Sequence, residues 1–237
     1  MSELKTDDHN GSYTDVRIPI TSRYYITLHN LYRQLKEIIH YLPNQRKNRI
    51  MLDLGCGNKP YQSIFSNQYS SYIGVDINSR SLADIIASGE NLPFKDEVFD
   101  LCICILTYEH LIDPEQVTCE VCRVLKEDGL LVLTAHAVAA VHNYPRDYWR
   151  WTDQGLRAML SKCFSNIVIH ELTTPIETIS QLAVTYLPVG KLGTVCSVLV
   201  NRLATSIGKS SINTRLPRLI GSYLAVAGKK WNYQHDA

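Results

Sequence analysis

The stretch "MLDLGCGNKPY" at residues 51–61 constrains the fold of this chain more than any other part of the sequence. Residues 49–54 form a short apolar run typical of a buried strand, and Gly55 and Gly57 follow it directly. Glycine allows positive φ angles and the close approach of a ligand to the backbone. Pro60 suits the first turn of a helix, where its missing N–H is not needed. Strand, glycine loop and helix start together predict a ligand cradle with free backbone donors.

The ligand predicted for this cradle is a nucleoside without a diphosphate. A dinucleotide-binding loop carries a third glycine, which lets the helix pack close to the strand behind the pyrophosphate, and Pro60 stands at that position. Asp76 ends the next strand-like run, 71–77, about twenty residues after Gly55, the spacing at which an acidic side chain accepts hydrogen bonds from ribose hydroxyls. For a lone aspartate, an ordinary turn residue at a strand end is the alternative.

Composition limits the class of protein. A chain of 237 residues with 45% apolar and 20% charged residues fits one domain with an elaboration. The N-terminal segment is polar and acidic rather than a signal peptide, so we expect a cytoplasmic protein with reduced cysteines. The pairs Cys102/Cys104 and Cys119/Cys122 lie in a predicted strand and a predicted helix, which favours core packing over a metal site. The net charge of +1 predicts no nucleic-acid partner.

Strands and helices alternate in the predicted order of elements. Helical spacing of apolar residues predicts a helix over 22–42, and Asp113 and Thr152 are the expected N-caps of helices over 114–125 and 152–164. Strands are expected near 49–54, 71–77, 83–87, 98–106, 130–136 and 166–170, and "KEDG" (126–129) is expected to end the helix before the fifth of them. The alternation predicts an α/β fold with a mostly parallel sheet that binds ligands at the carboxyl ends of its strands.

Six motifs occur in the order and spacing of the class I S-adenosylmethionine-dependent methyltransferases: "LDLGCGNKPY", "GVDI", "ENLPFKDEVFDLCICI", "YEHLIDP", "EVCRVLKEDGLLVLT" and "GSYLAVAGKK". The chain resembles most closely the small-molecule group of this family. The resemblance implies a Rossmann-like fold with a seven-stranded, mostly parallel sheet whose antiparallel last strand lies at the edge. It also implies four parts: an N-terminal helical extension (1–47), the cofactor-binding core (48–175), a helical insertion or lid (176–215) and a closing strand (216–237).

The resemblance implies S-adenosylmethionine as the cofactor and a set of residues around it. Asp53, Gly55 and Gly57 would hold the methionine end, Asp76 the ribose, the stretch from Glu90 to Leu92 the adenine, and the backbone at Leu106 and Thr107 would close the floor near the sulfonium. The whole cofactor set comprises Asp53, Gly55, Cys56, Gly57, Asp76, Ile77, Ser88, Glu90, Asn91, Leu92 and Leu106. Ser88 stands where many relatives carry an aspartate that pairs with the adenine amino group, and a neutral acceptor is a weaker partner.

The acceptor site is expected in the loop after the fifth strand, where His142 to Trp151 concentrate aromatic and charged residues. A hydroxyl acceptor would need a general base, for which His142 is the first choice, with His136 and Asp147 as further catalytic candidates. The candidate substrate contacts are His110, Tyr144, Arg146, Trp149 and Arg150, although His110 also suits a structural or cofactor-side role. The alternative is that the aromatic residues only pack the loop against helix 152–164 and that Asp147 pairs with a neighbouring arginine.

The function predicted from these features is O- or N-methylation of a small-molecule acceptor such as a sugar, a polysaccharide precursor or a natural product. One alternative is a non-catalytic S-adenosylmethionine-binding protein of the same fold that acts through a protein partner. A nicotinamide-dependent oxidoreductase is opposed by the missing third glycine, and arsenite methylation by the expected burial of the cysteines. The sequence identifies neither the acceptor nor the oligomeric state.

The C-terminal region is basic and amphipathic. Residues 178–230 hold seven Lys and Arg and no Asp or Glu, and apolar residues recur at helical spacing from Leu192 to Ile207. No run is long or apolar enough to span a bilayer. Two interpretations remain for residues 178–218: a lid packed on the sheet, or an interfacial element that meets an anionic membrane or a lipid-linked acceptor.

Overall fold

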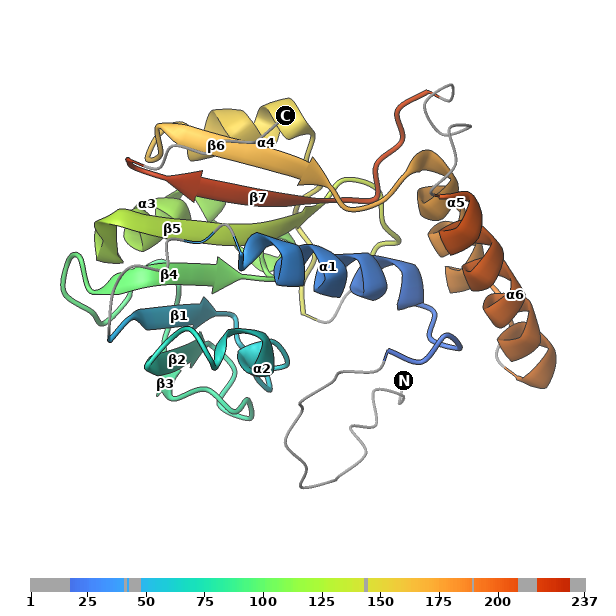
Figure 1. Cartoon of the computed structure of the whole chain (residues 1–237), viewed down its shortest axis with the longest axis horizontal. Coiled ribbons are helices and arrows are strands. Elements are labelled where there is room, and N and C mark those ends of the chain that lie inside the picture. Colours follow the sequence, from blue (N-terminus) through green and yellow to red (C-terminus); the bar gives the residue numbers. More distant parts are fainter. Residues whose placement is uncertain are drawn as a thin grey trace.

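A computed structural model describes residues 18–40, 42, 48–142, 145–188, 190–208 and 217–230. Figure 1 shows a central sheet with helices on both faces and a helical pair beyond one end. The elements in chain order are α1 (Tyr25–Ile38), β1 (Ile50–Leu54), α2 (Gln62–Phe65), β2 (Ser71–Asp76), β3 (Ile85–Ile86), β4 (Phe99–Cys104), the 3-10 helix η1 (Tyr108–His110), α3 (Pro114–Val124), β5 (Leu125–His136), α4 (Asp153–Leu160), β6 (Asn166–Glu171), α5 (Pro175–Thr185), α6 (Lys191–Ile207) and β7 (Ser222–Gly228).

The sheet has seven strands in the order β3-β2-β1-β4-β5-β7-β6. The pairs from β3 to β5 are parallel, and β7 runs antiparallel to both β5 and β6. This arrangement confirms the predicted Rossmann-like fold class. The expected place of the last strand was wrong, because β7 lies between β5 and β6 and β6 forms the edge. β7 takes the inner position because all seven of its residues are buried there, whereas β6 at the edge is partly exposed along its length.

Alternation along the central strands divides the core into two layers. Met51, Leu101 and Val132 face the layer that contains α1 and α2, while their neighbours Leu52, Cys102 and Leu131 face α3 and α4. Figure 1 shows α1 in front of the sheet and α3 behind it. Both faces of a parallel sheet are covered in this way because each crossover helix packs back onto it. Cys102 and Cys104 are fully buried, so the prediction that they pack in the core is confirmed, whereas it was wrong for Cys119, which is exposed on α3.

The residue types at helix ends predicted some helix boundaries correctly and others incorrectly. The Asp113 side chain accepts a hydrogen bond from the N–H of Gln116 at 2.9 Å, and Thr152 accepts one from Gly155 at 3.0 Å, so both predicted N-caps are confirmed. The helix expected to have Pro60 in its first turn begins only at Gln62. The segment "KEDG" does not form a loop, because β5 already begins at Leu125, which pairs with Phe99 across a register shift.

The helical insertion packs with its small residues inward. The buried positions of α6 are Gly193, Ser197, Asn201 and Ala204, and α6 contacts α5 and α1 rather than covering a face of the sheet. A side chain at Gly193 would collide with the carbonyl oxygen of Pro188. Asn201 donates hydrogen bonds to the carbonyls of Ile20 and Ser22, which satisfies its buried amide nitrogen. Within the described residues, α6 therefore packs on other helices, and its role as a lid stays a prediction.

Within the described ranges, no helix is both long enough and apolar enough to cross a membrane. The last residues of the predicted insertion, 209–215, lie outside those ranges.

Candidate functional site

The glycine loop after β1 uses its two glycines for different purposes. Gly55 has φ +73° and Gly57 has φ +48°, both in the left-handed region that favours glycine. A Cβ atom at Gly55 would collide with the Thr107 side chain, so this glycine lets the loop lie directly against the end of β4. A Cβ atom at Gly57 would meet nothing within 4 Å, so this part of the loop borders open space.

The loop does not offer the free backbone donors that the sequence predicted. The N–H groups of Gly55 and Cys56 donate to the carbonyl oxygen of Val75 at 2.8 and 3.1 Å, and that of Lys59 donates to Cys56 at 2.8 Å. The N–H of Gly57 donates to the Asp76 carboxylate at 2.9 Å. A diphosphate needs several unpaired N–H groups near a helix start. The pairing of these donors agrees with the exclusion of a dinucleotide.

Asp53 at the end of β1 is a buried carboxyl group with a phenol partner. Its side chain is 2% exposed and accepts a hydrogen bond from the Tyr72 hydroxyl on the neighbouring strand β2. Burial raises the pKa of Asp53 to about 7, against the opposing effect of the Tyr72 hydrogen bond. The nearby Lys59 amine is paired with Asp84 at 2.6 Å. Asp53 therefore changes its charge near neutral pH.

Asp76 lies across the loop from Gly57 with both oxygens oriented by the backbone. One oxygen accepts from Gly57, and the other accepts from the N–H of Asn78 at 2.7 Å. Each carboxylate oxygen has a second lone pair that can accept a hydroxyl donor. The adjacent Ile77 side chain is 77% exposed and offers an apolar surface beside this carboxylate.

Some groups in the stretch predicted to bind adenine already have partners within the protein. Leu92 is buried in the core and its N–H donates to the Glu120 carboxylate at 2.9 Å, so neither group is available to a ligand. The Ser88 hydroxyl accepts from the N–H of Glu90 at 3.3 Å within its own turn. Asn91 has an exposed side chain, and Glu90 a partly exposed one. The adenine contact of Leu92 is therefore not supported, and Ser88 is already used in a turn.

The backbone at the end of β4 is in an unusual conformation. Leu106 has φ +52°, which is uncommon for a residue with a side chain, and its N–H donates to the Thr134 hydroxyl on β5 at 2.7 Å. Such strained positions gather at functional sites. Since Gly55 lies against Thr107, Leu106 is held directly beside the glycine loop, where the sequence predicted the floor of the cofactor site.

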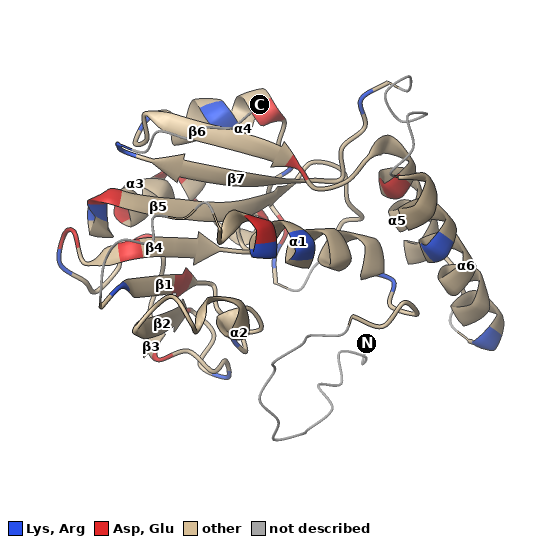
Figure 2. Cartoon of the chain, in the orientation of Figure 1, with Lys and Arg blue, Asp and Glu red and all other residues tan. Residues whose placement is uncertain are grey.

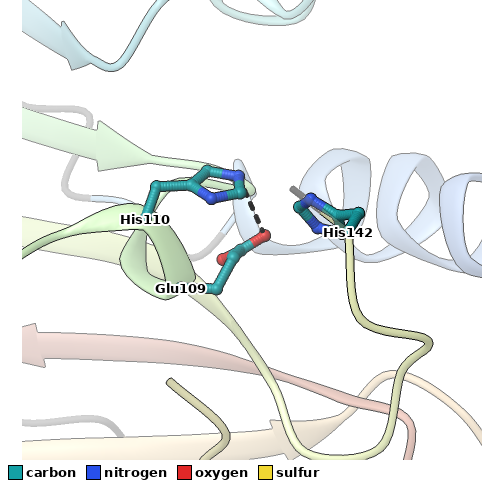
Figure 3. A group of neighbouring side chains, drawn as sticks. All are labelled: Glu109, His110 and His142. Carbon is teal, nitrogen blue, oxygen red and sulfur yellow. Dashed lines mark ion pairs between the residues drawn. The ribbon is translucent and has the colours of Figure 1, made fainter. Parts of the chain in front are cut away.

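A cluster of ionisable side chains follows at the carboxyl ends of β4 and β5, and Figure 3 shows two of them, His110 and His142, beside the Glu109 carboxylate. Glu109 is 1% exposed, and its Oε1 atom lies 3.3 Å from Nε2 of His136 and 3.8 Å from Nε2 of His110. The rings of His110 and His142 meet edge to face with centroids 5.1 Å apart. The structure therefore brings together three predicted histidines and Glu109, which the sequence analysis did not single out.

Hydrogen bonds to the second ring nitrogen orient two of these histidines. Nδ1 of His110 lies 2.8 Å from the carbonyl oxygen of Arg146 and must donate, because a carbonyl oxygen only accepts. Nδ1 of His136 lies 2.7 Å from the Ser222 hydroxyl on β7. Burial lowers the pKa of His136, which favours the neutral imidazole, against the opposing effect of the Glu109 charge.

Asp147 binds an arginine and the backbone of the loop after β5, and it does not bind an imidazole ring. Its two oxygens accept from the Arg150 guanidinium at 2.5 and 2.6 Å, and this pairing lowers the pKa of Asp147 to about 2. One oxygen also accepts from the backbone N–H of His142 at 3.2 Å. Asp147 thus positions the backbone of His142, and Arg150 is already paired. This is the pairing that the packing interpretation of the loop predicted.

The remaining predicted acceptor residues lie on the same loop with different environments. Trp149 donates its indole N–H to the carbonyl of Leu111 at 2.7 Å, stacks on Trp151 and stays 39% exposed. The Arg146 guanidinium lies 3.5 Å from the exposed Tyr148 hydroxyl. Tyr144 lies outside the described residues. Trp149 and Arg146 are therefore accessible, while Trp151 packs edge to face against the buried Tyr108.

A separate cavity of about 520 Å³ opens between α1, α5 and α6, lined by residues that include Asn30, Arg33, Glu177 and Thr205. None of the predicted cofactor or acceptor residues lines it.

Comparisons with known proteins agree with this geometry. Residues 52–133 match the family model described as a methyltransferase domain. An uncharacterized methyltransferase of Mycobacterium leprae is 35% identical over 98 residues, which cover 36% of each chain. The chain thus matches just over a third of the length of that curated relative. Among solved structures, phosphoethanolamine N-methyltransferase 2 of Haemonchus contortus, in complex with S-adenosyl-L-methionine, has a TM-score of 0.57 at 17% identity, covering 90% of this chain and 57% of that one.

A second solved structure, the cyclase SpnF, has a TM-score of 0.53 at 15% identity and covers 83% of this chain and 80% of that one. At such identities the likeness concerns the fold alone. The sheet order and the loop between β1 and β2 define a Rossmann-like methyltransferase fold. Residues 52–133 match a methyltransferase domain, and the sheet order around them is that of the class I methyltransferase fold.

Proposed function

We propose that this chain transfers the methyl group of S-adenosylmethionine to an oxygen or nitrogen of a small-molecule acceptor. The observation that carries the proposal is the adjacency of two sites at the carboxyl ends of the strands. The loop from Gly55 to Gly57 and the carboxylates of Asp53 and Asp76 suit a cofactor with an ammonium group and ribose hydroxyls. The histidine cluster around Glu109 follows directly after Leu106 and Thr107 and faces the acceptor.

Methyl transfer depends more on the alignment of cofactor and acceptor than on functional groups of the protein. Methyl transfer from a sulfonium is an in-line displacement, so holding the two reactants in place can supply about 7–11 kcal/mol of the barrier. A hydroxyl acceptor must also lose its proton, and a positioned group that promotes this step contributes typically about a hundredfold to ten-thousandfold. We assign this activation to the histidine cluster, and the acceptor class to a sugar, a polysaccharide precursor or a natural product.

The experiment is a transfer assay with S-adenosylmethionine labelled in its methyl group, screened against nucleotide sugars, glycolipid precursors and small phenols. We expect His142→Ala to bind S-adenosylhomocysteine as the wild type does while transfer falls by about a hundredfold or more. His40→Ala, at an exposed position near the end of α1, is the matched control. A normal turnover number for folded His142→Ala would remove this histidine from the reaction.

The alternative is a non-catalytic protein that binds the cofactor and acts through a protein partner. The fold alone does not decide this, since a cyclase shares it. The buried Glu109 beneath three histidines favours catalysis, because a binding module has no need of a cluster that costs desolvation energy. Cofactor binding without transfer to any acceptor class in the screen would favour the alternative.

We also infer that α6 meets an anionic membrane surface. Its apolar row points outward: Leu192 is 74% exposed and Leu203 60%, and Val195 and Leu199 on the same row are exposed as well. The charged residues of α6 are Lys191 and Arg202, with no acidic residue on this helix, and Figure 2 accordingly shows blue but no red positions along it. An exposed apolar row with basic neighbours is typical of a helix that lies in the membrane interface. Such a location would bring the acceptor site near lipid-linked precursors.

A further inference from the structure

The Glu109 carboxylate is buried, and no cationic group of the described residues is bonded to it. Its Oε2 atom has no hydrogen-bond partner among the described residues, and Oε1 has only the two histidine contacts at 3.3 and 3.8 Å. Arg150 acts on Glu109 through its charge, but its guanidinium is bound at two points to Asp147. Burying a carboxylate without a partner is costly, so such groups are normally paired or bound to a metal ion.

The tautomer of His110 also indicates that a proton or a cation belongs between this histidine and Glu109. Because Nδ1 donates its proton to the Arg146 carbonyl, a neutral His110 ring carries a lone pair on Nε2. That lone pair faces Oε1 of Glu109 at 3.8 Å, and two electron-rich atoms repel each other unless a proton or a cation lies between them. Imidazole ligands of metal ions commonly donate their other N–H to a backbone carbonyl in this way.

His142 supplies the third ligand. One ligand atom from each of Glu109, His110 and His142 can be chosen so that all three lie within 4.8 Å of one another. Ligand atoms around a tetrahedral Zn²⁺ are about 3.4 Å apart, so small side-chain rotations bring the three atoms onto one ion. Asp147 holds the backbone of His142 in place for this. Figure 3 shows the carboxylate facing both imidazoles.

We propose that Glu109, His110 and His142 form a binding site for a divalent transition metal ion of the Zn²⁺ class. Two imidazoles and one carboxylate are a common ligand set of catalytic zinc, which keeps a fourth position open. The proposal rests on methyl transfer as the function: the open position would bind the acceptor hydroxyl and promote loss of its proton to water. The oxygen then forms its bond to the methyl carbon while the carbon–sulfur bond breaks and sulfur keeps the electron pair.

The experiment must distinguish this metal site from two alternative explanations. In the first, a proton on Nε2 of His110 replaces the metal ion, and Glu109 pairs with an imidazolium. In the second, Zn²⁺ binds to thiols elsewhere, since Sγ of Cys119 lies 3.1 Å from Sγ of Cys163. The experiment therefore uses the full chain carrying Cys119→Ser and Cys163→Ser, stripped with a chelator and shown by circular dichroism to be folded.

Calorimetric titration with Zn²⁺ is the first measurement, and absorption spectroscopy after loading with Co²⁺ is the second. We expect one ion per chain, and a Co²⁺ spectrum with visible bands of nitrogen and oxygen ligation but no thiolate charge-transfer band. Glu109→Gln and His142→Ala should each weaken Zn²⁺ binding by about a hundredfold. His40→Ala is the control and should bind as the parent does.

The proposal is overturned if the parent binds no Zn²⁺ at one ion per chain, or if folded His142→Ala binds it as tightly as the parent. His142 lies on a partly exposed loop, so this variant keeps the test valid if Glu109→Gln fails to fold. S-adenosylhomocysteine binding is measured on the same samples. Cofactor binding without Zn²⁺ binding would reject the metal site alone, whereas Zn²⁺ binding without cofactor binding would reject the proposed function.

Discussion

Asp53 shows how burial changes the charge of one carboxyl group in the proposed cofactor site. The folded protein without cofactor holds a proton on Asp53 up to a pKa of about 7, because burial disfavours the charged carboxylate. An unfolded chain releases that proton near pH 4. Asp53 therefore lowers the stability of the free protein as the pH rises from about 4 to about 7, and this cost is then fully present above the folded pKa.

We predict that S-adenosylhomocysteine binds more tightly as the pH rises from about 6 to about 8, since its ammonium group pairs with the ionised form of Asp53 alone. Calorimetric titration across this range measures the effect. Asp53→Asn should bind more weakly at pH 8 and lose the dependence. A dependence of the same size in the Asp53→Asn protein would place its origin in another group.

Single residues also show where sequence reasoning reached its limit. Gly55, Gly57 and Asp76 could be proposed from the sequence because their predicted roles depend on a short stretch of chain and on one strand pairing. Glu109 sits in the quoted motif "YEHLIDP", yet its role depends on His136 and His142, which other elements bring to it. The contact of Leu92 with Glu120 was not predicted for the same reason, whereas the pairing of Asp147 with a neighbouring arginine was one of the predicted alternatives.

At the scale of elements, the loop after β5 is held by a two-point ion pair. We predict that Asp147→Asn lowers the free energy of unfolding by about 1.5–3 kcal/mol, the usual contribution of hydrogen bonds to a charged group. S-adenosylhomocysteine binding should stay within about twofold, since the loop lies on the acceptor side. Urea unfolding measures the first quantity, with Asp96→Asn, an exposed partner of Arg123, as the control. An unchanged midpoint would show that the pair does not hold the loop.

Helix α6 illustrates why periodicity alone leaves the orientation of an element open. The apolar spacing correctly predicted a helix, but the small residues Gly193, Ser197 and Ala204 allow closer packing and turn the apolar row outward. In the same way, the apolar sequence of β7 predicted a strand but not its place between β5 and β6. The position of an element depends on contacts with segments that are distant in the sequence.

The outward row of α6 predicts binding to vesicles that contain anionic lipid. In sedimentation with such vesicles, the full chain should co-sediment at low salt, and Leu199→Asp/Leu203→Asp should stay in the supernatant. Binding should weaken at high salt, because Lys191 and Arg202 contribute through charge. Neutral vesicles are the control for the lipid charge. Failure to co-sediment at low salt would reject the membrane-facing role.

At the scale of the whole molecule, four strand ends build one site. β1 and β2 contribute Asp53, the glycine loop and Asp76, while β4 and β5 lead into the histidine cluster, so the proposed cofactor and acceptor sites adjoin at the carboxyl edge of the sheet. Ligands bind at this edge in open α/β sheets in general. The fold class was predictable because the order of strands and helices constrains the topology. The arrangement of the proposed acceptor site was not, because it depends on contacts between Glu109 and histidines from different elements.

The most direct test of this account is the retention of radiolabelled S-adenosylmethionine by the purified chain, compared with NAD under the same conditions. We predict about one S-adenosylmethionine per chain and no retention of NAD. Asp76→Ala should weaken the binding at least about tenfold, as expected for the loss of a charge-assisted hydrogen bond. Retention of NAD, or of neither ligand, by folded protein would contradict the account.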